Sequence, residues 1–146
     1  YEFFDGPNKV VTTTKARLMQ ATQAKPYSYL LEGVRYVAQD LNREIEKIPD
    51  PQDWAKLALF LVDGGDTLGR ENQIRQVVQG YDPTYNLGRY PCKALLMGDI
   101  ALQQTLAGVF GDENVVVAND FRVLIEQSML NIKQALKHFL GSAQGW

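Results

Sequence analysis

The amino-acid sequence predicts an all-α fold, an up-down antiparallel four-helix bundle that follows an extended N-terminal arm and a short leading helix. Apolar residues recur at spacings of three and four along most of the chain, which is typical of helices that share a core. Turns with proline and glycine separate these stretches, and short turns favour antiparallel neighbours. We expect residues 1–25 to form the arm with its short helix, and residues 26–146 to form the bundle domain.

The composition is that of one globular domain. The chain has 146 residues, of which 45% are hydrophobic and 22% are charged, and this length allows a core without disulfide or metal staples. Its 15 basic and 17 acidic residues give a net charge of -2, which argues against a broad basic face for nucleic acid or anionic lipid. The longest apolar run, residues 57–62, is too short to span a bilayer. No transmembrane or targeting segment is therefore predicted.

The first elements are expected to be an extended arm and a short helix. Residues 1–12 combine aromatic side chains with Gly6 and Pro7, and this mixture breaks helical periodicity. A short helix is predicted from Thr14 to Gln23. It ends before Pro26, because the residue that precedes a proline avoids helical dihedral angles.

The clearest helical pattern runs from Ser28 to Ile48. Its apolar positions alternate at spacings of four and three: Leu30, Val34, Val37, Leu41, Ile45 and Ile48. Pro49 ends this helix. Asp50 and Pro51 then supply the N-cap and the first-turn proline of the next helix.

That next helix is predicted to continue to Gly80. We interpret the pair Gly64-Gly65 inside it as a kink that permits a close helix crossing, with a loop as the alternative. Residues 80–91 contain prolines, glycines and several tyrosines, and they predict an ordered connecting loop.

Two further helices complete the predicted bundle. The first begins at Pro91 and ends at Gly111, in line with the preference for proline at helix starts and glycine at helix ends. The second begins after Asp112 or Asn114 and ends at Gly141. Its apolar stripe, which is expected to face the bundle core, contains Val117, Phe121, Leu124, Ile125, Ile132, Leu136 and Phe139. The run Val115-Val116-Val117 is the one stretch that favours a strand, and its shortness favours assigning it to the last helix instead.

Residues with catalytic chemistry are scarce, so the sequence predicts a protein that is not an enzyme and has no metal ion or cofactor. The one histidine, His138, lies late in the last predicted helix, where a solvent-facing or capping role is expected. The one cysteine, Cys92, falls on an apolar stripe and is expected to be a buried small hydrophobe. The stretch Asp63 to Asp66 lacks the ligand pattern of a calcium loop. Asp99 and Asp120 are interpreted as members of structural ion pairs or as edge residues.

Aromatic residues in the arm and in the loop are the candidate binding residues. Tyrosine, phenylalanine and arginine anchor many protein interfaces, and a bundle core does not need them on these two segments. The alternative is that both segments fold back on their own domain. The predicted partner-binding set is Tyr1, Phe3, Phe4, Tyr81, Tyr85, Arg89 and Tyr90.

The predicted architecture resembles the PsbQ family, the extrinsic proteins on the lumenal side of photosystem II, with the PsbQ-prime branch of red-lineage algae nearest. The resemblance covers Pro26 to Gly141 as the bundle and Tyr1 to Lys25 as the docking arm. The segment Tyr36-Val37-Ala38-Gln39-Asp40-Leu41, followed by Trp54, is similar to a helix pattern of the family.

The resemblance implies a non-catalytic protein of the chloroplast thylakoid lumen, peripheral to the membrane. Such a subunit binds the photosystem II core antenna and other extrinsic subunits, and it helps to retain the ions of the oxygen-evolving cluster without ligating them. Phe3 and Phe4 would then dock on the complex, and Tyr85, Arg89 and Tyr90 would form a second contact. Two alternatives remain open: a helical-bundle adaptor or assembly factor of the cytoplasm, and a carrier of a small apolar ligand.

Overall fold

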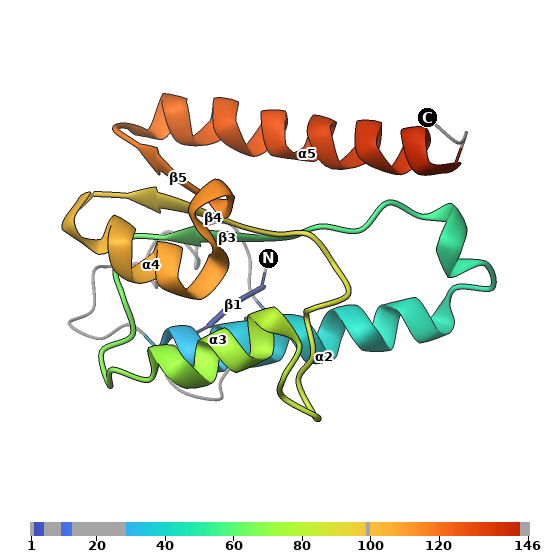
Figure 1. The fold of residues 1–146 in the computed structure, drawn as a ribbon, viewed down its shortest axis with the longest axis horizontal. Helices are drawn as coiled ribbons and strands as arrows, with labels where there is room; N and C mark the ends of the chain where they lie inside the picture. Colours follow the sequence, from blue (N-terminus) through green and yellow to red (C-terminus); the bar gives the residue numbers. More distant parts are fainter. Residues whose placement is uncertain (1, 5–9, 13–28, 99, 144–146) are drawn as a thin grey trace.

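The computed structural model has a mixed α/β fold, and the predicted all-α four-helix bundle is wrong. The structure describes residues 2–4, 10–12, 29–98 and 100–143. Its centre is a parallel sheet of three strands in the order β3-β4-β5 (Figure 1). The strands are β3 (Ala58–Val62), β4 (Cys92–Met97) and β5 (Val115–Ala118). A separate antiparallel sheet pairs β1 (Glu2–Phe4) with β2 (Val10–Thr12).

Three predicted helices contain the sheet strands. The helix expected from Pro51 to Gly80 is instead a 3-10 turn (Pro51–Asp53), β3, a loop and α3 (Glu71–Gln79). The helix expected from Pro91 to Gly111 is β4, a 3-10 turn (Ile100–Leu102) and α4 (Gln103–Phe110). Strands of a parallel sheet are covered on both faces and carry continuous apolar runs, which periodicity does not distinguish from short buried helices.

Two elements lie close to their predicted places. The helix predicted over Ser28 to Ile48 is present as α2 (Leu30–Lys47). The last helix, α5 (Phe121–Ala143), begins later than predicted, because the valine run at its expected start forms β5 after a 3-10 turn (Asp112–Asn114). The short helix predicted over Thr14 to Gln23 lies outside the described residues.

The helices form two layers around the sheet. Phe60 and Leu96 point toward α2, α3 and α4 and share a core with residues of those helices. Leu95 and Ala118 point the other way and pack with Leu124 of α5. The alternation along the strands therefore places α5 alone on one face and α2, α3 and α4 on the other (Figure 1).

The loop between α3 and β4 is ordered, as predicted. Gly80 ends α3 with a left-handed φ of 84°, and a Cβ on Gly88 would lie 2.7 Å from the Gly80 Cα. The amide of Leu87 also donates a hydrogen bond to the Val77 carbonyl at 3.0 Å. Two glycines are thus needed where the loop returns past the helix end. The pair Gly64-Gly65 lies in a loop after β3, which was the alternative to a kink.

No described helix is both long enough and apolar enough to cross a lipid bilayer.

Candidate functional site

One face of the central sheet is only partly covered. Leu61 of β3 and Leu95 of β4 are register partners, so their side chains lie on the same face. Leu95 is fully buried beneath α5, whereas Leu61 is 59% exposed. Strands lie about 4.8 Å apart and a helix is about 10 Å wide, so a single helix covers about two strands. Helix α5 accordingly lies mainly over β4 and β5, and on this face of β3 Leu59 is half-buried while Leu61 is left exposed.

Helix α5 carries a second apolar line besides the one that packs on the sheet. At 100° per residue, Leu124 and Asn131 fall on the sheet-facing side, and both are buried. The second line is rotated from it by roughly a third of a turn. We call it the α5 stripe, and its members are 44% to 64% exposed: Phe121, Ile125, Met129, Ile132, Leu136 and Leu140.

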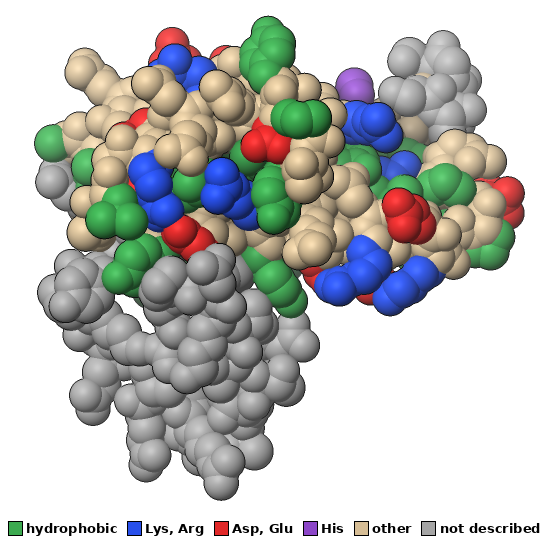
Figure 2. Space-filling model, turned by 90° about the horizontal axis from the view of Figure 1, so that it is seen from below, with side chains coloured by type: hydrophobic (Ala, Val, Ile, Leu, Met, Phe, Trp, Pro, Cys, Tyr) green, Lys and Arg blue, Asp and Glu red, His purple; other side chains and the backbone are tan. Residues whose placement is uncertain are grey.

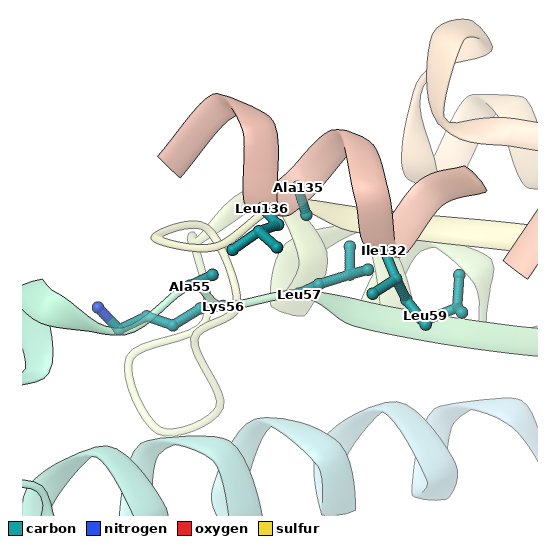
Figure 3. A pocket seen from close by; sticks show the side chains of 7 residues that line it. All are labelled: Ala55, Lys56, Leu57, Leu59, Ile132, Ala135 and Leu136. Carbon is teal, nitrogen blue, oxygen red and sulfur yellow. The ribbon is translucent and has the colours of Figure 1, made fainter. Parts of the chain in front are cut away.

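The α5 stripe borders an apolar groove of about 420 Å³. We call it the α5–β3 groove, and its lining residues are Ala55, Lys56, Leu57, Leu59, Ile132, Ala135 and Leu136. Figure 3 shows Ile132 and Leu136 pointing from α5 toward the chain that carries Leu57 and Leu59. The groove exists because α5 has 23 residues, about 35 Å, and no strand of this sheet exceeds six residues, about 20 Å.

Basic residues follow the outer edge of the α5 stripe. Arg122, Lys133 and Lys137 fall on one flank of the helix, and all three are exposed. Glu126 is on the same flank, and its carboxylate pairs with Arg122 at 3.1 Å. In the described part of the chain, Lys133 and Lys137 form no ion pair.

A second cluster, at the opposite end of the sheet, is structural. The buried Asp66 carboxylate accepts hydrogen bonds from the Leu31 amide at 3.3 Å and from the Arg70 amide at 3.1 Å. It therefore joins the N-terminus of α2 to the start of α3. The Arg70 guanidinium pairs with Asp66 at 2.9 Å and with the Glu32 carboxylate through two bonds of 2.5 and 2.6 Å. The residues of this cluster satisfy one another.

The charges in this cluster perturb both carboxyl groups. Burial alone would raise the pKa of Asp66, but hydrogen bonds from Arg70 and from the Leu31 amide outweigh it and hold that pKa below its usual value. The hydrogen bond from Arg70 likewise lowers the pKa of Glu32. Residues 63–66, for which a turn or a kink is expected from the sequence, form a bend and loop after β3. In the described ranges, no three or more His, Cys, Asp or Glu side chains gather closely enough to hold a metal ion.

The structure divides the predicted partner-binding residues. Tyr1 lies outside the described residues, and the structure gives only the backbone of Phe3 and Phe4, on β1. Tyr81 is 75% exposed and Arg89 is also exposed. For these five residues, a binding role stays a prediction.

Two tyrosines of the loop fold back on their own domain, as the alternative interpretation allowed. Tyr85 packs on the core and lies 5.4 Å from the Arg35 guanidinium. The Tyr90 hydroxyl donates a hydrogen bond to Asn42 Oδ1 at 2.7 Å. Both side chains therefore have a structural role that the sequence analysis did not assign.

Four other predictions concern single polar or reactive residues. Cys92 is buried, as expected, and burial raises the pKa of its thiol to about 11. His138 is exposed on α5. Asp120 accepts a hydrogen bond from the Val123 amide at 2.9 Å and caps the first turn of α5. Asp99 lies outside the described residues.

Sequence analysis missed the α5 stripe. It assigned Phe121, Ile125, Ile132 and Leu136 to a bundle core, and each is exposed by about half or more. The signal that was missed is the number of apolar residues on this helix. A helix that packs on one sheet face needs a single line of apolar residues, and α5 has two. Comparisons of the chain with protein-family models, curated proteins and solved structures found no match.

Proposed function

We propose that this domain is a non-catalytic protein-binding module whose contact surface is the α5 stripe together with the α5–β3 groove. One observation carries the proposal: six large apolar side chains, about half exposed, lie along one helix, and two of them, Ile132 and Leu136, line an apolar groove beside β3. Large contiguous apolar surfaces on a folded domain mark protein or membrane interaction sites and ligand-binding grooves.

The shape of the surface favours a helix as the bound element. A helix laid beside α5 and over β3 would complete the helical layer that this face of the sheet lacks. The α5 stripe spans 19 residue steps from Phe121 to Leu140, about 28 Å along the helix, which is the length of an ordinary partner helix. Helix-in-groove binding uses apolar anchors at spacings of three and four.

The earlier functional expectations fit this surface to different degrees. The PsbQ resemblance rested on four antiparallel helices, and the parallel sheet removes that support for a role in photosystem II. The adaptor alternative keeps its interaction role, although the bundle assumed for it is wrong. The carrier alternative has one observation in its favour, because about 420 Å³ lies within the size range of small-molecule pockets.

Substitutions in the stripe provide the test. Ile132→Asp places a charge among apolar groups, and it should reduce partner binding by roughly tenfold or more because buried anchors dominate interface energies. Gln134→Asp is the matched control, because Gln134 is exposed on α5 away from the stripe. A photo-crosslinker at Met129 identifies the candidate partner, which is then purified and titrated by calorimetry against both variants.

Equal affinity of both variants for the purified partner would contradict the proposal. A retained lipid or pigment, detected by native mass spectrometry and displaced by Ile132→Asp alone, would favour the carrier function instead.

A further inference from the structure

Basic residues outnumber acidic residues beside the α5 stripe, and this excess indicates the charge of the partner that the proposed binding surface would accept. The flank beside the α5 stripe carries Arg122, Lys133 and Lys137, and its one acid, Glu126, already pairs with Arg122. The sequence has no acidic residue from Gln127 to Trp146. The half of α5 that overhangs the α5–β3 groove is therefore purely basic.

A further basic residue, Lys56, belongs to the chain that leads into β3. Its side chain contributes to the groove lining but runs along that chain, away from Ile132 and Leu136 of α5 (Figure 3). Its Nζ donates a hydrogen bond to the Pro51 carbonyl, which holds the ammonium without neutralising it. A helix seated in the groove would therefore meet Lys133 and Lys137 on the side of α5.

This arrangement differs from the face formed by α2 and α3. There, basic and acidic side chains lie interspersed (Figure 2), and several pair within one turn of α2, such as Arg43 with Asp40 and Lys47 with Glu44. Charges of mixed sign cancel and attract no particular partner. On the basic flank of α5, Glu126 compensates Arg122, whereas Lys133 and Lys137 form no ion pair in the described part of the chain.

We propose that the partner element is an amphipathic helix with an acidic flank, which lies along α5 with its apolar face in the α5–β3 groove. This inference rests on the proposed function. Acidic residues on the flank next to α5 would meet Lys133 and Lys137, which are exposed and, among the described residues, unpaired. Complementary charge of this kind speeds association and excludes partners of the wrong sign.

Two other occupants fit less well. A second copy of the chain, packed α5 against α5 about a two-fold axis, would place the basic flank of each helix beside the same flank of the other, and like charges oppose that contact. A flat anionic membrane would reach the α5 stripe but would not fill a groove that lies between a helix and a strand. Both occupants are outcomes of the test below.

The test uses synthetic amphipathic peptides of about 18 residues, long enough to span the stripe. One peptide has leucines on one face and glutamates on both flanks. The second has lysines in place of the glutamates, and the third has the composition of the first in an order without helical periodicity. Fluorescence anisotropy measures the affinity of each for the full chain at low salt and at about 150 mM salt.

We expect the glutamate peptide to bind roughly tenfold or more tightly than the lysine peptide, with the difference narrowing in salt because exposed charges are screened. The double variant Lys133→Glu with Lys137→Glu should reverse this preference. Ile132→Asp should abolish binding of both peptides, and Gln134→Glu should leave both affinities unchanged. Circular dichroism and thermal melting verify that each variant is folded.

The outcomes separate the two proposals. If both peptides bind equally and Ile132→Asp still abolishes binding, the acidic partner is wrong and the binding module stands. If no periodic peptide binds better than the aperiodic one, both proposals fail. If the protein floats with vesicles that contain phosphatidylserine, if the double variant reduces this flotation and if no peptide binds, the surface is a membrane-binding site. A dimer in light scattering that Ile132→Asp dissociates would assign it to a second copy.

Discussion

Asp66→Asn tests whether the buried carboxylate holds α2 and α3 together. The Asp66 side chain is completely buried, and its two oxygens accept four hydrogen bonds, from the Leu31 amide and from the amide, Nε and Nη2 of Arg70. An asparagine keeps one acceptor and turns an NH2 group toward the donors that faced the other oxygen. Two hydrogen bonds are therefore lost, whichever way the amide is oriented.

The expected loss is about 3 kcal/mol in the free energy of unfolding. Hydrogen bonds to charged groups contribute about 1.5–3 kcal/mol each, and the lower half of that range applies because Arg70 keeps Glu32 as a partner. Urea unfolding followed by circular dichroism measures the effect. With a slope of about 2 kcal/mol per molar, the midpoint should fall by about 1.5 M. Asp40→Asn is the matched control, because Asp40 pairs with Arg43 on the exposed face of α2.

The pH dependence gives the same hypothesis a second measurement. The folded-state pKa values of Asp66 and Glu32 lie below their unfolded values, so the ionised pair stabilises the fold above about pH 4 and loses this contribution as the pH falls further. The stability difference between wild type and Asp66→Asn should shrink between about pH 5 and pH 2. A midpoint shift no larger than that of Asp40→Asn, or a difference that grows toward low pH, would refute the reasoning.

Three other substitutions or reactions probe separate parts of the structure. Gly88→Ala should destabilise the fold by about 2 kcal/mol or more, seen as a lower Tm, because the new Cβ would meet the backbone of Gly80; an unchanged Tm would contradict this packing. Tyr90→Phe should cost about 1 kcal/mol in urea unfolding through loss of the bond to Asn42, and no change would mean that the bond is absent in solution. The raised pKa of Cys92 makes its thiolate fraction at pH 8 about a hundredfold smaller in the folded protein than in the unfolded chain. Disulfide reagents should therefore label it only on unfolding, and rapid labelling of the folded protein would be the contrary result.

Local features of the sequence predicted the elements whose signals are local. The stripe from Leu30 to Ile48 has the period of one helical face, and α2 is present there. The turn residues of 80–91 predicted an ordered loop, and Gly80 and Gly88 form its close approach. The burial of Cys92 followed from the apolar residues around it.

The sheet depended on contacts between distant residues. Ala58 pairs with Cys92, and Ala94 pairs with Val115. The spacing of apolar residues along the chain predicts neither of these registers. The runs 58–62 and 94–97 are short and apolar, which suits a buried strand and a buried helix equally. The assignment of these strands to helices therefore turned an α/β fold into a predicted bundle, and the architectural resemblance to PsbQ followed from that error.

The sequence by itself determined α2, the turns and the scarcity of histidine and cysteine, because these depend on residue type and on neighbours within a few positions. Only the tertiary structure decided the α5 stripe and the α5–β3 groove, which form the proposed binding surface. Whether Ile132 and Leu136 are core or surface depends on how wide the sheet is and how far α5 extends beyond it, and both are set by the pairing of strands far apart in the chain. A helix longer than the strands it covers, on a sheet wider than one helix, leaves apolar residues exposed.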